Sequence, residues 1–323
     1  MKGRIVFLLS IIAGLIIRPA YAENNAAAAA SAQAVVMPAS VSVSALSDAG
    51  APLRGTLYRV RHHGNTAWLF GTIHVGKPTF YPLEREVTAA LHTAGKLVLE
   101  IDIRDNAPFQ RALHAHGTYA NDDGIERHLS HDTLAILRQA LDRHGIAFDS
   151  MRRFKPWLLA NMLVGLDLER HGYDRTHGIE SFLISTAGKS KDVQELESAE
   201  YQMSLYDDMS DAMQEQYLRE NLAELADGNA LRKAQALIQA WASADGNAIE
   251  QFMREAANEK TTSSEFMQRV LLDRRNPEMA RKIESLLQRE ESSFVGVGLL
   301  HLVGDTGVPK LLKEKGYEVE KLY

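Results

Sequence analysis

The sequence predicts an α/β fold whose central mixed sheet is built from both ends of the chain and is covered by a large helical insertion. Short apolar runs typical of strands lie between residues 57 and 101 and again between 294 and 320. Between about 107 and 291, apolar residues instead recur every three or four positions, which is the period of an amphipathic helix. Both ends also carry one pattern, an apolar run that closes on Gly-x-x-His and leads into a helix and a further strand.

The first 55 residues are predicted to lie outside this fold. Lys2 and Arg4 precede an apolar run, and Ala20-Tyr21-Ala22 supplies a small-residue cleavage site. Residues 1–22 are therefore predicted to be a secretory signal peptide cut after Ala22, with an uncleaved anchor as the alternative. Residues 23–55 are rich in Ala and Ser without a helical or strand period, and they are predicted to be a disordered linker. We expect a periplasmic or secreted protein that has no membrane attachment after cleavage.

The domain, residues 56–323, is predicted to begin with a β-hairpin around the turn His63-Gly64-Asn65. A loop with two prolines and an amphipathic helix ended by Gly95 follow. The next strand carries Glu100 near its end. The predicted elements are strands at 57–60, 66–70 and 97–101 and a helix at 83–93.

The middle of the chain is predicted to be helical, with a single strand at 192–197 that again ends in an acid, Glu197. After the insertion, the chain is predicted to return to a strand, a helix stopped by Gly316, and a last strand. These three elements are expected at 294–297, 308–315 and 317–320. The helices of the insertion are expected at 107–116, 131–144, 156–170, 177–187, 199–226, 230–242, 246–256, 262–272 and 277–290.

Charge and composition exclude several classes of function. The net charge of -6 argues against a nucleic-acid-binding role, which needs a concentrated basic surface. The absence of cysteine excludes disulfides, thiolate metal sites and thiol catalysis. The sequence also contains no H-E-x-x-H zinc helix and no G-x-S-x-G nucleophile elbow.

His74 and His301 are the predicted centre of the site. Each follows a strand by way of Gly-x-x-His, in Gly71-Thr72-Ile73-His74 and Gly298-Leu299-Leu300-His301. Ligands of α/β sheets bind beyond the carboxyl ends of the strands, so two such units side by side would direct both imidazoles at one metal ion. The alternative is that each histidine caps a loop and bonds to a backbone carbonyl.

Glu100 is the predicted third metal ligand. A carboxylate at the end of an apolar strand must be paired, hydrogen-bonded or bound to metal, because burying it alone is costly. With two histidines it would complete a three-ligand site that leaves room for water. The alternative is a structural ion pair with Arg275.

Three further residues are candidates for catalysis. Glu197 and Glu180 are each predicted to be a ligand, a general base or a partner that orients a ligand histidine. For Glu180, a first-turn acid that complements the helix dipole is the alternative. Arg275 would stabilise an oxyanion or hold a substrate carboxylate, while Asn276 would be the N-cap before Pro277.

These segments resemble the TraB/GumN family, which is similar to the Tiki metalloproteases and more distantly to the ChaN and erythromycin-esterase-like groups. The resemblance spans roughly residues 56–323, and one departure is Glu180, where such proteins often have aspartate. It implies a metal-dependent hydrolase fold centred on the two histidines and Glu100, and for the Tiki branch peptidase activity with manganese or cobalt. The matching segments are Leu69 to His74, Val98-Leu99-Glu100, His177-Gly178-Ile179-Glu180, the Glu197 strand, Arg275-Asn276-Pro277 and Val295 to Gly304.

The leading hypothesis is therefore a secreted or periplasmic metal-dependent hydrolase that uses a metal-activated water. Among hydrolases, a peptidase is the leading choice. The divalent ion would be Mn, Co, Fe or Zn, since ligand type alone does not choose among them. The expected partner is a peptide or small-molecule substrate, with no nucleic acid. The alternatives are a non-catalytic module that binds a peptide, haem or metal, and an ester or lactone hydrolase.

Overall fold

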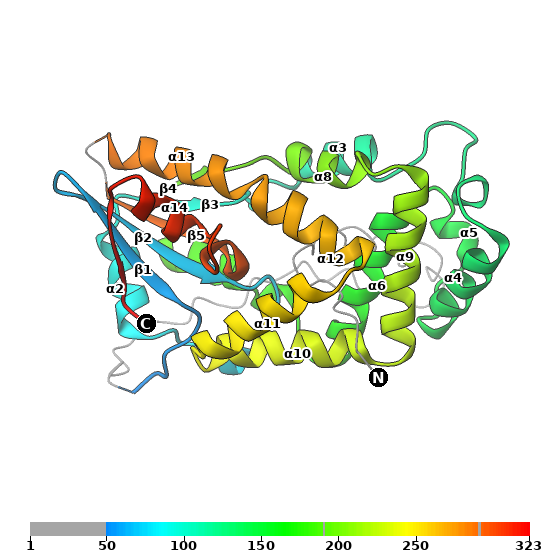
Figure 1. Cartoon of the computed structure of the whole chain (residues 1–323), viewed down its shortest axis with the longest axis horizontal. Helices are drawn as coiled ribbons and strands as arrows, with labels where there is room; N and C mark the ends of the chain where they lie inside the picture. Colours follow the sequence, from blue (N-terminus) through cyan, green and yellow to red (C-terminus); the bar gives the residue numbers. More distant parts are fainter. Residues whose placement is uncertain (1–49, 190, 290–291) are drawn as a thin grey trace, which may run out of the picture.

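The computed structural model describes residues 50–189, 191–289 and 292–323, so the predicted signal peptide and most of the predicted linker lie outside the described residues. A six-stranded sheet with the order β4-β3-β5-β2-β1-β6 forms its centre (Figure 1). The predicted α/β class with a mixed sheet from both chain ends is confirmed. The strands are β1 (Leu57–His62), β2 (Asn65–Thr72), β3 (Lys96–Leu99), β4 (Asp192–Glu195), β5 (Ser293–Gly298) and β6 (Glu318–Lys321).

Strands β1 and β2 form the predicted antiparallel hairpin. His62 pairs with Asn65, which leaves His63 and Gly64 as a two-residue turn. Both turn residues have positive φ, 47° and 90°, as a tight turn that matches the twist of its strands requires. β6 pairs antiparallel with the outer edge of β1.

Strands β2, β5, β3 and β4 pair in parallel, and this places their carboxyl ends at one edge of the sheet. β5 lies between β2 and β3, with Thr72 opposite Gly298 and Leu99 opposite Gly296. β4 continues the parallel set beside β3. The two Gly-x-x-His units therefore follow neighbouring strands, although 226 residues lie between His74 and His301 in the sequence. Residues that follow these four strands meet at the same edge.

Helices cover both faces of the sheet and extend beside it. One face packs on α2, α7, α10 and α11, through side chains such as Phe70, Leu183 and Trp241. The other face packs on α13 and α14, through side chains such as Val295 and Ile283. The helices are α2 (Arg85–Thr93), α3 (Asn106–His116), α4 (His131–Arg143), α5 (Phe148–Met151), α6 (Pro156–Arg170), α7 (Ile179–Ala187), α8 (Ala199–Asp207), α9 (Asp211–Ala226), α10 (Asn229–Ala242), α11 (Gly246–Asn258), α12 (Thr262–Phe266), α13 (Asn276–Leu287) and α14 (Val308–Glu314), with short 3-10 turns η2 (Pro78–Phe80), η3 (Ile125–Arg127), η4 (Arg175–His177) and η6 (Leu299–Leu302) and the π-helical η5 (Met267–Asp273).

Part of the helical insertion has a core of its own. Helices α3 to α6, α8 and α9 pack on one another beside the sheet, around stacked aromatic rings such as Trp157 and Tyr206, whose centroids lie 4.9 Å apart (Figure 1). The insertion thus covers the sheet with some of its helices and builds a second helical body with the others. The cavity described below lies where α3 and α8 of this second body reach the edge of the sheet.

Several boundaries differ from the sequence prediction. The helix expected at 199–226 is two helices, because Ser210 is extended and its side chain accepts a hydrogen bond from the Met213 amide to cap α9. The helix expected at 262–272 becomes π-helical from Met267. The short α5 was not predicted. Strands β3 and β4 end before Glu100 and Glu197, so both acids follow their strands instead of closing them.

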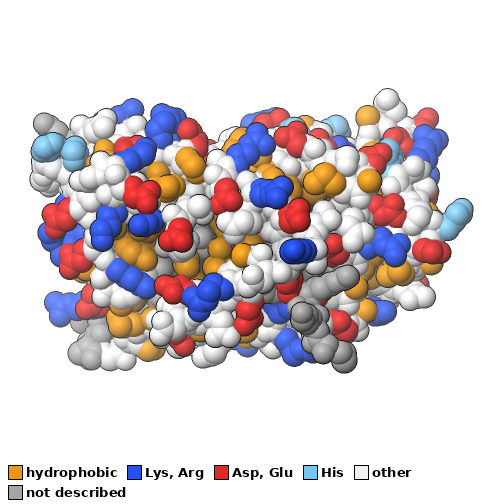
Figure 2. All heavy atoms as spheres, in the orientation of Figure 1, with side chains coloured by type: hydrophobic (Ala, Val, Ile, Leu, Met, Phe, Trp, Pro, Cys, Tyr) orange, Lys and Arg blue, Asp and Glu red, His pale blue; other side chains and the backbone are white. Residues whose placement is uncertain are grey.

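The last residues of the predicted linker contact the domain. Arg54 donates hydrogen bonds to the carbonyls of Phe80 and Ala242, and the Gly55 amide donates to the Trp241 carbonyl. No helix in the described residues has both the length and the apolar composition that a membrane span requires. On the face drawn in Figure 2, acidic and basic side chains are interspersed over the surface.

Glu84, the residue before α2, is a buried acid that gives the fold a pH-dependent stability. Glu84 is 1% exposed, and neither oxygen of its carboxylate has a hydrogen-bond partner among the described residues. Burial raises the pKa of Glu84 from 4.5 to about 7. Because the folded state then holds its proton more tightly than the unfolded chain, this group lowers stability as pH rises from about 4.5 to 7.

We expect Glu84→Gln to stabilise the protein, and to do so by about 2 kcal/mol more at pH 8 than at pH 5. Urea unfolding at the two pH values measures the difference. Glu265→Gln, at an exposed position in the first turn of α12, is the matched control and should show no such pH dependence. An equal effect of Glu84→Gln at both pH values would contradict the assignment.

Candidate active site

The predicted site residues lie together at the carboxyl edge of the parallel strands. His74 follows β2 by two residues, Glu100 directly follows β3, and His301 lies in η6 directly after β5. Glu197 follows β4, and its amide bonds to the Glu100 carbonyl at 2.8 Å, so the pairing of β3 and β4 continues up to the two acids. The structure thus brings both predicted histidines and both strand acids to one place.

His301 is fully buried and its tautomer is fixed by Asn276. The Asn276 Nδ2 donates to the Thr306 carbonyl at 2.8 Å, so Oδ1 is the atom that faces His301 Nδ1 at 2.5 Å. The proton of His301 is therefore on Nδ1, and Nε2 carries a lone pair. Nε2 is buried and has no hydrogen-bond partner in the described part of the chain. Burial, followed by the charge of Arg275, lowers the pKa of His301 to about 3, so the ring is neutral.

His74 is held by the segment that contains the His-Gly-Ile-Glu motif. Glu180, in the first turn of α7, accepts a hydrogen bond from His74 Nδ1 at 2.8 Å. Burial opposes the charge of His74, but the pKa of His74 is raised because the carboxylate of Glu180 outweighs burial. Glu180 is thus both the first-turn acid and the partner that orients His74, which joins two of the roles predicted for it.

Glycines allow this segment to lie against the chain around His74. The amide of Ile179 bonds to the Ile73 carbonyl at 3.0 Å, and Gly76 forms an isolated bridge with Asp174. A side chain at Gly76 would place Cβ 2.0 Å from the His177 carbonyl oxygen, and one at Gly178 would place it 2.6 Å from that of His74. Both positions therefore require glycine.

Glu100 is the hub of the polar network. Its Oε1 accepts from the Gly298 amide at 2.5 Å and lies 3.7 Å from His301 Nε2, while Oε2 accepts from Arg275 at 2.6 Å and from Gln202 at 3.1 Å. Burial opposes ionisation, but the charge of Arg275, helped by the hydrogen bond from the Gly298 amide, lowers the pKa of Glu100 well below its usual range. Glu100 is therefore an anion at neutral pH.

Arg275 and Glu197 lie behind Glu100, and their predicted catalytic roles do not fit this placement. The Arg275 guanidinium bonds to both oxygens of Glu197, and the two side chains are 4% and 2% exposed. The ion pair between Arg275 and Glu100 was the alternative considered for Glu100. Because Arg275 faces carboxylates and not open space, it is placed to fix Glu100, and Glu197 is placed to fix Arg275.

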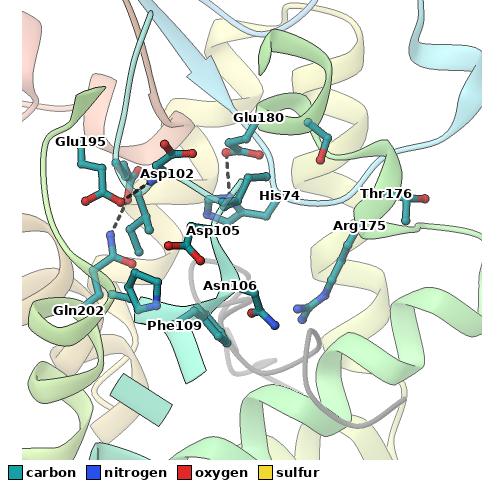
Figure 3. Close-up of a pocket in the computed structure, with 16 residues that line it drawn as sticks. His74, Asp102, Asp105, Asn106, Phe109, Arg175, Thr176, Glu180, Glu195 and Gln202 are labelled. Carbon is teal, nitrogen blue, oxygen red and sulfur yellow. Dashed lines mark hydrogen bonds and ion pairs between the residues drawn. The ribbon is translucent and has the colours of Figure 1, made fainter. Parts of the chain in front are cut away.

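A cavity of about 320 Å³ opens beside this network (Figure 3). Among the predicted site residues, His74, Glu100 and Glu180 line it, whereas His301, Glu197 and Arg275 lie outside the lining. The other lining residues come from the loop after β3, the start of α3, the Arg175 turn and α8. They include Ile101, Asp102, Ile103, Asp105, Asn106, Phe109, Arg175, Glu195 and Gln202.

Two site residues were not predicted from the sequence. Asn276 was assigned as a helix N-cap, but Arg275 occupies that position and the Asn276 side chain holds His301. Gln202 of α8 joins Glu100 to Glu197, at 3.1 and 2.9 Å. For Asn276, the sequence signal available was its place beside Arg275. For Gln202, nothing in the surrounding helical pattern distinguishes it from other polar residues.

The fold and the site define a class of protein. In this class, an α/β sheet brings two strand-end histidines and a buried carboxylate together near a cavity. The sequence profile of the TraB/PrgY/gumN family matches residues 56–321, and the chain belongs to that family. The resemblance read from the motifs is therefore confirmed.

Individual relatives agree with this membership. The chain is 25% identical to the uncharacterized protein YbaP of Escherichia coli over 256 residues, which covers 76% of this chain and 87% of YbaP. It is 39% identical over 70 residues to a metalloprotease TIKI homolog of Amphimedon queenslandica, covering 21% of this chain and 14% of the relative. A similar match to metalloprotease TIKI2 of Danio rerio, 39% over 57 residues, covers 17% and 11%. No solved structure gives a significant match to the chain.

The donor atoms of the two histidines fit the metal ion that the resemblance implies. Ligand histidines commonly donate their second ring N–H to a carboxylate or carbonyl, as His74 does to Glu180 and His301 to Asn276. Nε2 of His301 is buried and has no hydrogen-bond partner among the described residues, so its lone pair is available to a metal ion. Within the described residues, however, no three His, Asp or Glu side chains are already arranged around one ion position. The fit is thus one of donor chemistry and orientation.

We expect Arg275→Met to lower the free energy of unfolding by about 3–5 kcal/mol, because it leaves two buried carboxylates without their counter-charge. Adding Glu197→Gln to this variant should restore part of the loss, since one of the two charges is then removed. Urea unfolding measures both. Arg274→Met, which changes a half-exposed arginine whose nearest acid is 3.9 Å away, is the control and should cost less than about 1 kcal/mol.

Proposed function

We propose that the protein is a metal-dependent hydrolase that cleaves peptides. The observation that carries this proposal is the matched state of the two Gly-x-x-His histidines: each engages Nδ1 with a side-chain oxygen, which leaves Nε2 as the donor atom. Both lie at the strand edge near the anionic Glu100, and His74 also lines a cavity of about 320 Å³. A pair of imidazoles held in this way is typical of a metal site and is not needed for stability alone.

His74, His301 and Glu100 are the residues that would hold the ion, as Mn, Co, Fe or Zn. When bound, a divalent ion supplies a water of lowered pKa and a Lewis acid for the scissile carbonyl. The raised pKa of His74, in which the pull of Glu180 exceeds the opposing effect of burial, means that metal binding there competes with a proton. Metal affinity should therefore increase with pH.

The protein's own groups set the geometry and the protonation states. Asn276 and Glu180 fix the tautomers of His301 and His74, and Arg275 keeps Glu100 ionised and in one orientation. Of the two acids proposed to accept a proton, Glu180 lines the cavity and Glu197 does not. We therefore assign proton transfer with a bound substrate to Glu180, and assign Glu197 to positioning Arg275.

Peptides are the favoured substrate class because two relatives are named metalloproteases, although each matches over less than a quarter of this chain. The YbaP relative covers most of the chain but its name states no activity. Incubation of the metal-loaded protein with a mixed peptide library, read by mass spectrometry, tests the proposal. Metal binding without turnover of any peptide would instead support a binding module.

We expect His74→Ala and His301→Ala each to remove peptide cleavage while the circular dichroism spectrum is retained. Asn276→Ala should lower metal affinity by about 10- to 100-fold, since it frees the ring that it now orients. Calorimetric titration with Mn²⁺ measures this effect apart from turnover. His114→Ala, at an exposed histidine of α3, is the control. Full cleavage by both His74→Ala and His301→Ala would contradict the proposal.

We further propose that the protein is exported, on the basis of the basic start, apolar run and Ala20-Tyr21-Ala22 of the sequence. N-terminal sequencing of protein recovered from the periplasm or medium is expected to begin at Glu23. Protein that stays in the cytoplasm and begins at Met1 would contradict export. The hydrolase proposal does not depend on this result.

A further inference from the structure

The cavity beside His74 has two unlike walls. One carries Arg175 (Figure 3), and the other, built by the loop after β3 and the start of α3, contributes the apolar side chains of Ile103, Pro108 and Phe109 next to polar ones. We propose that this cavity is a substrate subsite in which Arg175 binds a carboxylate of the substrate while Ile103, Pro108 and Phe109 receive an apolar side chain. The inference deepens the proposed function, because it names the peptides that such a hydrolase would take.

Arg175 is placed by the same segment that holds His74. The bridge between Gly76 and Asp174 fixes the residue before Arg175, and the Ile179 amide bonded to Ile73 fixes the segment after it. The backbone of Arg175 is therefore fixed relative to that of His74. A group bound at Arg175 would be held at a constant offset from His74, and this offset would select which peptide bond reaches the histidine.

The guanidinium of Arg175 lies over helix α6 at a glycine. A Cβ added at Gly165 would lie 3.1 Å from Arg175 Nη2, so a larger residue there would crowd the guanidinium. Figure 3 shows the Arg175 guanidinium and the Asn106 amide directed toward the same space at one end of the cavity. An amide beside a guanidinium adds a further donor for a carboxylate oxygen.

The charges of the cavity favour an anion at Arg175. Arg175 is the one lysine or arginine among the described residues that line it. Burial lowers the pKa of Arg175 to about 10, against the opposing effect of Glu169 and Asp174, so the side chain stays cationic at neutral pH. Nε and Nη2 of Arg175 are buried, so Nη1 is the guanidinium nitrogen that would meet a substrate carboxylate. In a partly desolvated site such a charge-assisted hydrogen bond is stronger than at the open surface.

The acids that line the cavity already have partners. Glu100 is paired with Arg275, Glu180 with His74, and Asp102 with Arg104. The remaining two, Glu195 and Asp105, accept hydrogen bonds from the backbone amides of Asp102 and Ala107. These acids would repel a substrate carboxylate from the rest of the cavity, so Arg175 fixes its position.

The apolar side chains of the second wall give a reason for the exposure of Ile103 to solvent. Ile103 is 44% exposed, and it borders the same cavity as Pro108 and the partly buried Phe109. Apolar side chains grouped at the edge of a binding cavity are typical of a pocket that covers an apolar group of the ligand. The expected substrate is thus a peptide with an apolar residue near a carboxylate, at its C-terminus or on an acidic side chain.

Three acetylated peptides test the inference. The first is acetyl-Ala-Ala-Leu-Ala with a free carboxylate, the second is its C-terminal amide, and the third is the amide with Glu as the last residue. We expect the wild-type protein to favour the first over the second in kcat/KM by about 10- to 150-fold, the range of a charge-assisted hydrogen bond. The third peptide shows whether a side-chain carboxylate serves equally well.

Arg175→Met should bring the ratio of kcat/KM between acid and amide close to one, and Arg175→Lys should give an intermediate ratio. Arg111→Met, at an exposed arginine of α3 outside the cavity lining, is the matched control and should keep the wild-type ratio. Phe109→Ala should lower the preference for Leu over Ser at the third position. Should Arg175→Met fail to fold by circular dichroism, Arg175→Lys carries the test.

The two proposals fail in different ways. Cleavage of acid and amide at equal rates, with no change in Arg175→Lys, overturns the subsite and leaves the hydrolase standing. If the wild-type protein cleaves none of the peptides, the hydrolase proposal fails, and calorimetric titration of the acid and amide peptides into wild-type and Arg175→Lys protein decides the subsite. Equal affinity for both peptides in that titration would overturn it.

Discussion

The ion pairs between Arg275 and the two acids Glu100 and Glu197 are the constraint on which the site depends. Two carboxylates at the ends of adjacent strands are buried side by side, which is costly unless a cation lies between them. Arg275 reaches them from the end of the π-helical η5, just before α13. A π-helical turn shifts the register of the chain that follows it, and such turns are frequent at functional sites. The helical insertion therefore supplies the charge that lets the sheet carry two acids at this edge.

The segment Arg275-Asn276-Pro277 also links the acids to His301. Asn276, directly after Arg275, holds His301, and Pro277 then starts a helix that packs on the sheet. Glu100 in turn accepts the amide of Gly298, the glycine of the second Gly-x-x-His unit. A change in the position of α13 would therefore move Arg275 and Asn276 together, and with them the orientation of Glu100 and His301. Hydrogen bonds thus link residues of motifs that lie far apart in the sequence, so that these residues would move together.

The sequence predicted the sheet, the strand-end histidines and the strand-end acids, because each has a local signature: an apolar run followed by glycine or a carboxylate. It gave the ion pair between Arg275 and Glu100 only as an alternative and missed the pair between Arg275 and Glu197, since the partners of a buried arginine depend on which strands are neighbours. Gln202 carries no signature because its neighbours along the chain resemble those of an ordinary helix. Asn276 lies in the segment Arg275-Asn276-Pro277, but an asparagine before proline also suits a helix cap, so its bond to His301 was not predicted. The break at Ser210 was missed for a related reason: a serine within a helical pattern reads as a tolerated polar residue, and only its extended backbone makes it a cap.

The two histidines share a pattern in sequence but differ in the proton chemistry that the fold gives them. His301 is fully buried beside the positive charge of Arg275, and burial with that charge lowers its pKa to about 3, so its ring is neutral at neutral pH. His74 is partly exposed at the cavity, and although burial opposes its charge, Glu180 raises its pKa. The neutral partner, Asn276, accompanies the buried ring, and the acidic partner, Glu180, accompanies the one at the cavity. Proton exchange with a ligand is therefore confined to the side of the site that the ligand can reach.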